Sequence, residues 1–172
     1  MFWQNRDPRF EMSVAYNGAP WPLSAKATRK QWSYTGVLDE SAGSIVTGFY
    51  CRKITNPSLA ASQSQYNSNT GGGSGMDWVE LRFAEVVMNL AECANETGNI
   101  TEAKDMVRKI RQRAGIVAGD YDFGLGVATN VQEMRDLILN ERRVEFAMEG
   151  KRYWDLRRTR NLHLLSARQS LK

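Results

Sequence analysis

The chain has 172 residues and a formal net charge of +4, with 23 Lys and Arg interspersed among 19 Asp and Glu. This mixture does not favour a nucleic-acid binder, which gathers its basic residues on one face. No run of about 20 apolar residues is present to span a bilayer, and two cysteines with one histidine are too few for a disulfide framework or a metal site.

The first part of the chain, residues 1–76, is loop-like and carries two short β-strand patterns. The alternation of Glu11–Tyr16 predicts a strand, the Asn17–Gly18 pair that follows predicts a turn, and the β-branched and aromatic run Ile45–Cys51 predicts a second strand. Residues 62–75 are low in complexity and predict a flexible loop. They are no phosphate-binding loop, because no Lys-Ser/Thr pair follows the glycines.

From Asp77 onward the apolar residues recur with a helical period. One helix is predicted over residues 78–97, with Asp77 as its N-cap and Gly98 just beyond its end. Its apolar residues lie nearly all round the helix, which indicates burial on more than one side. Cys93 is interpreted as a small core residue on its apolar side.

A second helix is predicted over residues 102–114, with Thr101 as its N-cap. The connection between the two helices is only a few residues long, so they are expected to form an antiparallel hairpin. This hairpin is similar to a tetratricopeptide unit. One such unit does not bury its own faces, and that predicts packing against neighbouring elements.

A third helix is predicted over residues 131–148, after a glycine-rich connector. Asn130 is its expected N-cap, and Glu133 is placed for a capping box. The aromatic segment Tyr153–Leu156 is expected to fold back onto the helices, because Trp and Tyr bury large areas. The predicted fold class is mainly α, with tetratricopeptide-like helical pairs in residues 77–172 and short β-strands in the loop-rich part.

Acidic and basic side chains alternate at the end of the third predicted helix and beyond it. Glu141 and Glu145 are one turn apart, a spacing that by itself fits the carboxylate pair of a glycosidase. Interleaved arginines would keep these carboxylates ionised, which is wrong for a general acid. We therefore interpret the residues as a structural ion-pair network made of Glu141, Arg142, Arg143, Glu145, Arg152 and Asp155.

Aromatic residues in the loop-like part are the candidate ligand contacts, because aromatic side chains commonly line binding sites. The alternative is that they anchor loops onto the core, as most Trp residues do. Trp21 lies between two prolines, on a stiff extended backbone. The candidates are Trp3, Tyr16, Trp21, Trp32 and Tyr34.

No catalytic set is evident. The lone histidine, His163, lies in a polar tail, and the chain has no Gly-x-Ser-x-Gly motif for a nucleophilic serine. We therefore expect a protein that binds rather than one that catalyses, with no catalytic residue, no metal site and no cofactor.

Several motifs together resemble the SusD/RagB family of outer-membrane nutrient-binding lipoproteins. They occur in the order of the family and cover nearly the whole chain, and the last is the most specific. The motifs are Asp7–Phe10 with Tyr16–Gly18, Gly48–Lys53 with Asn56–Ser58, Leu81–Val86 leading to Ala91–Gly98, and Ile138–Phe146 with Glu149–Arg158.

The resemblance implies a helical scaffold that supports a loop-rich ligand region, here residues 1–76, in one structural domain with residues 77–172. It implies non-enzymatic capture of oligosaccharides or other nutrients on the outward face of the outer membrane in Bacteroidetes. The implied partner is a TonB-dependent SusC-like transporter. Family members are longer, so we expect this chain to be a C-terminal portion, with the lipid anchor outside it. The alternative is a tetratricopeptide-type module that binds another protein.

Overall fold

A computed structural model describes residues 3–22, 26–33, 47–59 and 77–165. The fold is mainly α, as predicted. The chain forms two compact units. The helical unit contains the residues up to Arg9 and those from Val79 onward, and the loop unit is Phe10–Trp78. No helix within the described ranges is long and apolar enough to cross a membrane.

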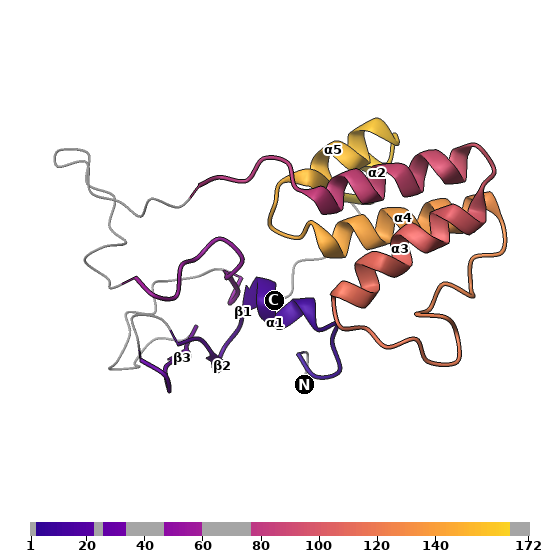
Figure 1. Ribbon diagram of the computed structural model, residues 1–172. Coiled ribbons are helices and arrows are strands. Elements are labelled where there is room, and N and C mark those ends of the chain that lie inside the picture. Colours follow the sequence, from indigo (N-terminus) through magenta and orange to yellow (C-terminus); the bar gives the residue numbers. More distant parts are fainter. Residues whose placement is uncertain (1–2, 23–25, 34–46, 60–76, 166–172) are drawn as a thin grey trace. The chain divides into compact units, whose positions relative to one another are not determined.

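Helices α2 (Phe83–Glu96) and α3 (Ile100–Arg113) form the predicted hairpin (Figure 1). Gly98 follows α2 with φ of +83°, and its N–H donates to the carbonyl of Asn95 at 3.0 Å. Glycine enters this left-handed region without the clash of a Cβ atom. The predicted end of the helix at Gly98 is therefore confirmed, and the chain reverses within a few residues.

Both helices of the hairpin begin elsewhere than the sequence predicts. α2 does not begin directly after Asp77, because the chain is still extended at Arg82, with φ of −128° and ψ of 158°. α3 begins earlier than predicted, because Asn99 caps it by accepting a first-turn backbone N–H at 3.2 Å. Asparagine caps helices at least as well as threonine. The prediction of Thr101 as the cap is therefore wrong.

Helix α4 (Val131–Glu145) is capped as predicted. Oδ1 of Asn130 accepts the N–H of Glu133 at 3.0 Å. The carboxylate of Glu133 reaches back to the N–H of Thr129 at 2.7 Å. The helix ends at Glu145, short of the predicted residue 148.

Helix α5 (Lys151–Arg158) and the 3-10 helix η3 (Leu162–Leu165) follow α4. Leu156 is buried, whereas Tyr153 and Trp154 are 49% and 60% exposed. The segment Tyr153–Leu156 packs back onto the helices as predicted, but through Leu156, and the expected burial of its aromatic rings is wrong. A short helix buries one face, and in α5 that face carries Leu156 rather than the aromatic rings.

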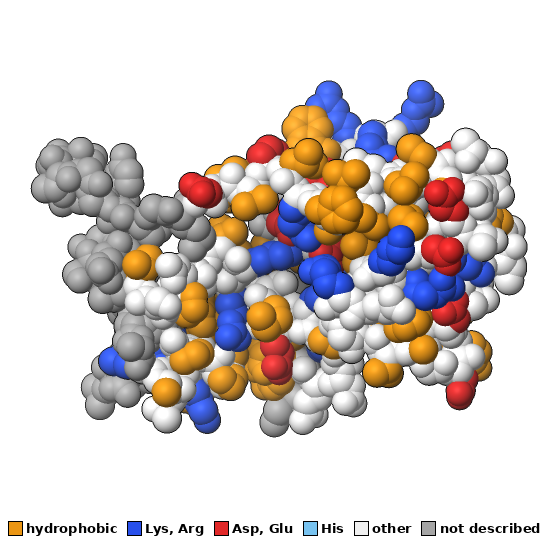
Figure 2. Space-filling view, viewed as in Figure 1, with side chains coloured by type: hydrophobic (Ala, Val, Ile, Leu, Met, Phe, Trp, Pro, Cys, Tyr) orange, Lys and Arg blue, Asp and Glu red, His pale blue; other side chains and the backbone are white. Residues whose placement is uncertain are grey.

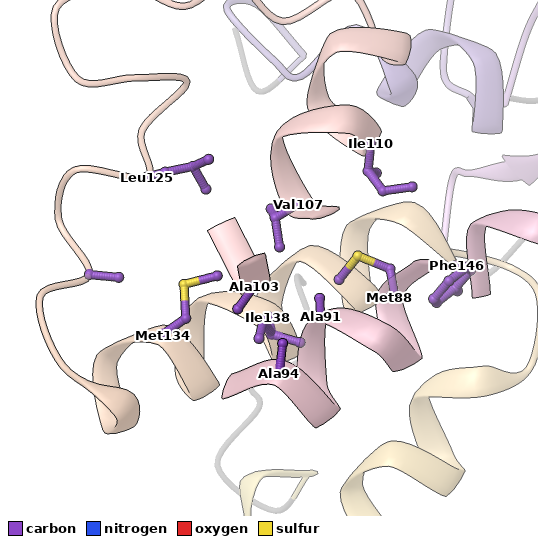
Figure 3. Packing of buried hydrophobic residues seen from close by; sticks show 11 residues of the cluster. Met88, Ala91, Ala94, Ala103, Val107, Ile110, Leu125, Met134, Ile138 and Phe146 are labelled. Carbon is purple, nitrogen blue, oxygen red and sulfur yellow. The ribbon is translucent and has the colours of Figure 1, made fainter. Parts of the chain in front are cut away.

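The core of the helical unit lies where α2, α3 and α4 pack together (Figure 3). Alanines on α2 and α3 allow close approach of the hairpin helices, and longer side chains fill the space toward α4. The connector between α3 and α4 contributes a leucine and an alanine. The buried cluster contains Met88, Ala91, Ala94, Ala103, Val107, Ile110, Leu125, Ala128, Met134, Ile138 and Phe146.

α2 is not buried on several sides, contrary to the prediction. Phe83, Val86 and Leu90 are 79%, 49% and 44% exposed, and Figure 2 shows apolar side chains gathered over this helix. Cys93 is exposed as well, so its prediction as a core residue is wrong, and neither it nor Cys51 forms a disulfide. The helix carries more apolar surface than α3 and α4 cover in the described part of the chain.

The described part of the loop unit contains most of α1 (Arg9–Ser13) and two small antiparallel sheets. β1 (Val14–Ala15) pairs with β4 (Tyr50–Cys51), with Val14 opposite Cys51. β2 (Ala19–Pro20) pairs with β3 (Lys30–Gln31), with Ala19 opposite Gln31.

The strand predicted over Glu11–Tyr16 is wrong in its first half, which is helical. So short an alternation does not separate a strand from a helical turn. The predicted turn is confirmed, because Gly18 has φ of +82° and its N–H donates to the carbonyl of Gln31 at 2.6 Å. The second predicted strand is present at its end, as β4. Its residues 45–46 and the predicted loop 62–75 lie outside the described residues.

Candidate functional site

The described part of the loop unit contains a pocket of about 330 Å³. This volume lies at the lower end of the range for small-molecule sites. Most of its wall is apolar, and two charged side chains border it. The lining residues are Glu11, Met12, Val14, Tyr16, Ala19, Pro20, Pro22 and Arg52.

Local backbone signals bring these residues together. The pairing of β1 with β4 continues through the N–H of Arg52, which donates to the carbonyl of Ser13 at 2.9 Å. The turn at Gly18 carries the chain from β1 into β2, so Tyr16 and Ala19 line the same pocket. A Cβ at Gly18 would lie 3.4 Å from the Trp32 ring, so glycine suits both the turn and the packing.

Tyr16 is the one aromatic residue on the pocket wall that the structure describes. Its ring stacks on Phe10, with centroids 5.6 Å apart and planes inclined by 20°. Its hydroxyl lies 3.4 Å from Oε1 of Glu11. Burial and the nearby Glu11 carboxylate raise the pKa of Tyr16, so the phenol stays protonated and remains a hydrogen-bond donor.

Trp21 is buried in the loop unit and Trp32 is half-buried, and neither lines this pocket. Trp21 is 6% exposed, its ring meets Tyr50 edge-on at 6.2 Å, and the guanidinium of Arg29 lies 5.7 Å from its centroid. Trp32 is half-buried with its ring against Gly18. Both positions match the interpretation of loop anchors.

The remaining aromatic candidates lie elsewhere. Trp3 is half-buried and belongs to the helical unit. Tyr34 lies outside the described residues. Of the candidates that lie in the loop unit and are described, Tyr16 lines the pocket and Trp21 and Trp32 do not.

A second cluster of polar side chains surrounds two carboxylates of α4 in the helical unit. The side chains of Glu141 and Glu145 are both only 2% exposed. The two oxygens of Glu141 accept from Nη1 of Arg9 at 2.6 Å and Nε of Arg111 at 2.7 Å. Both oxygens are thus occupied by arginines, and the carboxylate is closed to solvent.

Glu145 is surrounded in the same way. It binds Arg9 at 3.0 Å and Arg82 at 2.7 Å, and it also binds Arg113. Burial opposes its ionisation, but hydrogen bonds from Arg82 and Arg9 and the charges of Arg82 and Arg113 outweigh burial and lower the pKa of Glu145. A carboxylate held ionised has no proton to give, so this geometry does not suit a glycosidase.

A third group of ion pairs joins α4 to α5. Buried Arg142 donates from Nε to both oxygens of Asp155, at 3.1 and 3.0 Å, and from Nη1 to Asn89 at 2.8 Å. Arg158 donates from Nε to the same Asp155 at 3.0 Å. These bonds tie α2, α4 and α5 together around one buried carboxylate.

The sequence singled out the carboxylates but not the arginines that bind them. Arg9, Arg82 and Arg111 come from separate segments, so no local spacing marks them as partners. The motifs Asp7–Phe10 and Leu81–Val86 contain Arg9 and Arg82, but neither motif indicates that these arginines bind Glu141 or Glu145. Among the other predicted network members, Arg143 is exposed and Arg152 is half-buried.

The SusD family model matches residues 1–169 of the chain. This chain belongs to the SusD family. Two SusD-like proteins of Formosa agariphila are 33% identical to it over 92 residues and 36% identical over 82 residues, which are 52% and 46% of the chain. A crystal structure of a SusD-like protein from Bacteroides fragilis superposes with a TM-score of 0.68 and 30% identity over 92% of the chain.

The SusD-family chain spans only a small part of each of these relatives. It covers 18% and 16% of the two Formosa proteins and 29% of the Bacteroides fragilis chain. The similarity to the solved structure extends over both the helical unit and the loop unit, because it covers nearly all of the present chain.

Proposed function

We propose that this chain belongs to a non-enzymatic nutrient-binding protein that captures oligosaccharides or other nutrients. The captured ligand passes to a TonB-dependent SusC-like transporter in the outer membrane. Proteins of the SusD family work with such transporters and with glycans. Membership of this family over residues 1–169 is the observation that carries the proposal.

In this proposal the two units have different roles. The helical unit is a scaffold, because its buried carboxylates are saturated by arginines. The loop unit binds the ligand, because its pocket has the size of a small-molecule site. Tyr16 lines this pocket, while Trp21 and Trp32 pack within the loop unit. Trp3 and Tyr34 remain proposed as further contacts.

The protein is proposed to act as a lipoprotein on the outward face of the outer membrane. Pull-down from a solubilised outer-membrane fraction tests this partnership, with the full gene product as bait. The expected partner is a TonB-dependent transporter. Recovery of soluble proteins alone, with no transporter, would count against delivery across the outer membrane.

Calorimetry and affinity electrophoresis against a panel of polysaccharides test ligand capture directly. The variant Tyr16→Ala is expected to weaken binding, since it removes the aromatic wall of the pocket. Trp154→Ala is the matched control, because that ring is 60% exposed in the helical unit. If the folded protein binds no nutrient of any class, the proposal fails.

A second candidate function is a tetratricopeptide-type module that binds a protein segment. The exposed apolar face of α2, formed by Phe83, Val86 and Leu90, favours it, because such faces mark interaction surfaces. A Val86→Glu variant discriminates between the two functions. If the variant no longer binds a soluble protein partner but still binds glycan, the interaction-module function is supported. If the variant keeps both interactions, that function is disfavoured.

A further inference from the structure

Arg52 is held at the pocket wall by backbone groups. Its Nη1 donates to the carbonyl of Glu11 at 2.9 Å and to the carbonyl of Pro20 at 3.2 Å. Both of these residues also line the pocket. The guanidinium is therefore ordered before a ligand arrives, and binding does not have to restrict its rotamers again.

The charge of Arg52 is not neutralised by any carboxylate in the described part of the chain. Its Nη1 serves two carbonyl oxygens, and its Nε and Nη2 make no hydrogen bond within the described ranges. That pair of donors is one of the guanidinium edges that match a carboxylate or sulfate in a bidentate arrangement. In the helical unit, by contrast, carboxylates bind Arg9, Arg82, Arg108, Arg111 and Arg142.

The rest of the pocket suits a ring that carries both C–H faces and hydroxyl groups. Met12, Val14 and the prolines form apolar walls. The Tyr16 hydroxyl and the Glu11 carboxylate stand at the polar side, 3.4 Å apart. Glu11 is exposed, so water and salt screen its repulsion of an anion, and its oxygens accept hydrogen bonds from sugar hydroxyls.

We propose that this pocket recognises an acidic saccharide, with the carboxylate or sulfate of one sugar unit bound by Arg52. The sugar ring then packs against the apolar walls, and its hydroxyls bond to Glu11 and Tyr16. This inference rests on the proposed function as a nutrient binder and names the ligand class for that site.

Calorimetry on the full gene product tests the inference with three probes: oligogalacturonate, a sulfated galactan oligosaccharide and a neutral galactan oligosaccharide. An acidic probe is expected to bind. The substitution Arg52→Gln is expected to lower the affinity for this probe about 10- to 100-fold, the loss typical of removing a hydrogen bond to a charged group. Lys30→Gln is the matched control, because it removes the same charge from an exposed residue of β3. The two acidic probes separate a carboxylate from a sulfate.

Two further measurements do not depend on the fold of the Arg52 variant. Raising the salt concentration is expected to weaken the binding of the acidic probe and to leave the binding of the neutral probe unchanged. Glu11→Gln keeps one oxygen acceptor for the sugar hydroxyls and removes the remaining like charge, so this variant is expected to bind the acidic probe at least as tightly as the original protein does. Neutral galactan binding as tightly as the acidic probes, without salt dependence, overturns this inference but leaves nutrient capture intact. Failure of every probe and of every other nutrient tested overturns both.

Discussion

Arg9 and Arg82, which flank the loop unit in the sequence, both bind the carboxylate of Glu145. Arg9 binds Oε2 at 3.0 Å and Arg82 binds Oε1 at 2.7 Å. Asp7 binds the other side of Arg9 at 2.6 Å. Arg9 thus ties the short N-terminal segment of the helical unit to two carboxylates of α4.

Replacing Arg9 by Ala is expected to destabilise the chain by about 3–5 kcal/mol. The change leaves Glu141 and Glu145 short of a partner while they stay buried, and that is the costly way to break a buried ion pair. Urea denaturation followed by circular dichroism measures the effect. Arg143→Ala on α4 is the control, because Arg143 is exposed, and its change should stay within about 0.5 kcal/mol. Equal losses in both variants would contradict this account.

The stability of the chain is expected to fall in acid because of Glu145. Its pKa is lower in the folded chain than the ordinary value of 4.5, so folding favours the ionised form. This contribution is complete above about pH 4.5 and is lost as the pH falls through the lower folded-state pKa. Asp7 acts in the same direction, because hydrogen bonds from Arg9 lower its pKa.

Urea denaturation at a series of pH values between 7 and about 3 checks this expectation. A Glu145→Gln variant is less stable at neutral pH, but its stability should decline less steeply in acid. If the stability of the variant and that of the original chain decline in parallel as the pH falls, Glu145 is not a source of the acid sensitivity.

Replacing Asn130 by Ala is expected to destabilise the helical unit by about 1 kcal/mol, the usual value of an N-cap. The change removes the side-chain oxygen that accepts the N–H of Glu133 at 3.0 Å. Asn140→Ala is the matched control, since Asn140 lies exposed within the same helix. Alanine favours a helix interior, so the control should be neutral or slightly stabilising. Thermal or urea unfolding distinguishes the two.

Truncation of Met88 to Ala is expected to cost about 2–5 kcal/mol, because this side chain is fully buried between α2 and its neighbours. Leu90→Ala on the same helix should cost far less, because Leu90 is 44% exposed. Comparing the midpoints of urea unfolding tests the assignment of the two faces of α2. A larger loss for Leu90 than for Met88 would show that the faces are interchanged.

The sequence predicted the parts of the fold that depend on neighbours along the chain. Gly98 and Asn130 act through backbone conformation and a cap within a few residues, so the hairpin and the start of α4 were predictable. The start of α2 was not, because Trp78 and Val79 continue the apolar pattern while Arg82 is extended and bound to Glu149 and Glu145 from α4 and its end. That contact lies far away in the sequence.

The pocket was the least predictable feature for the same reason. Arg52 reaches it through the pairing of β4 with β1 and through carbonyls of α1 and β2, and no local motif encodes those contacts. Tyr16 was identified from its residue type alone. Trp21 was predicted from its residue type and its two flanking prolines, yet it is packed against Tyr50, because large aromatic rings serve as anchors as readily as they serve as contacts.

Because Arg9 and Arg82 bind the same carboxylate, the sequence between them can vary in length among related chains. The loop unit lies between these two arginines in the sequence, and both arginines bind the carboxylate of Glu145. Doubling the length of a flexible loop raises the free-energy cost of closing it by only about 0.6 kcal/mol. Insertions, deletions or exchanges between these two arginines can therefore change the loop unit while the helical unit keeps its packing.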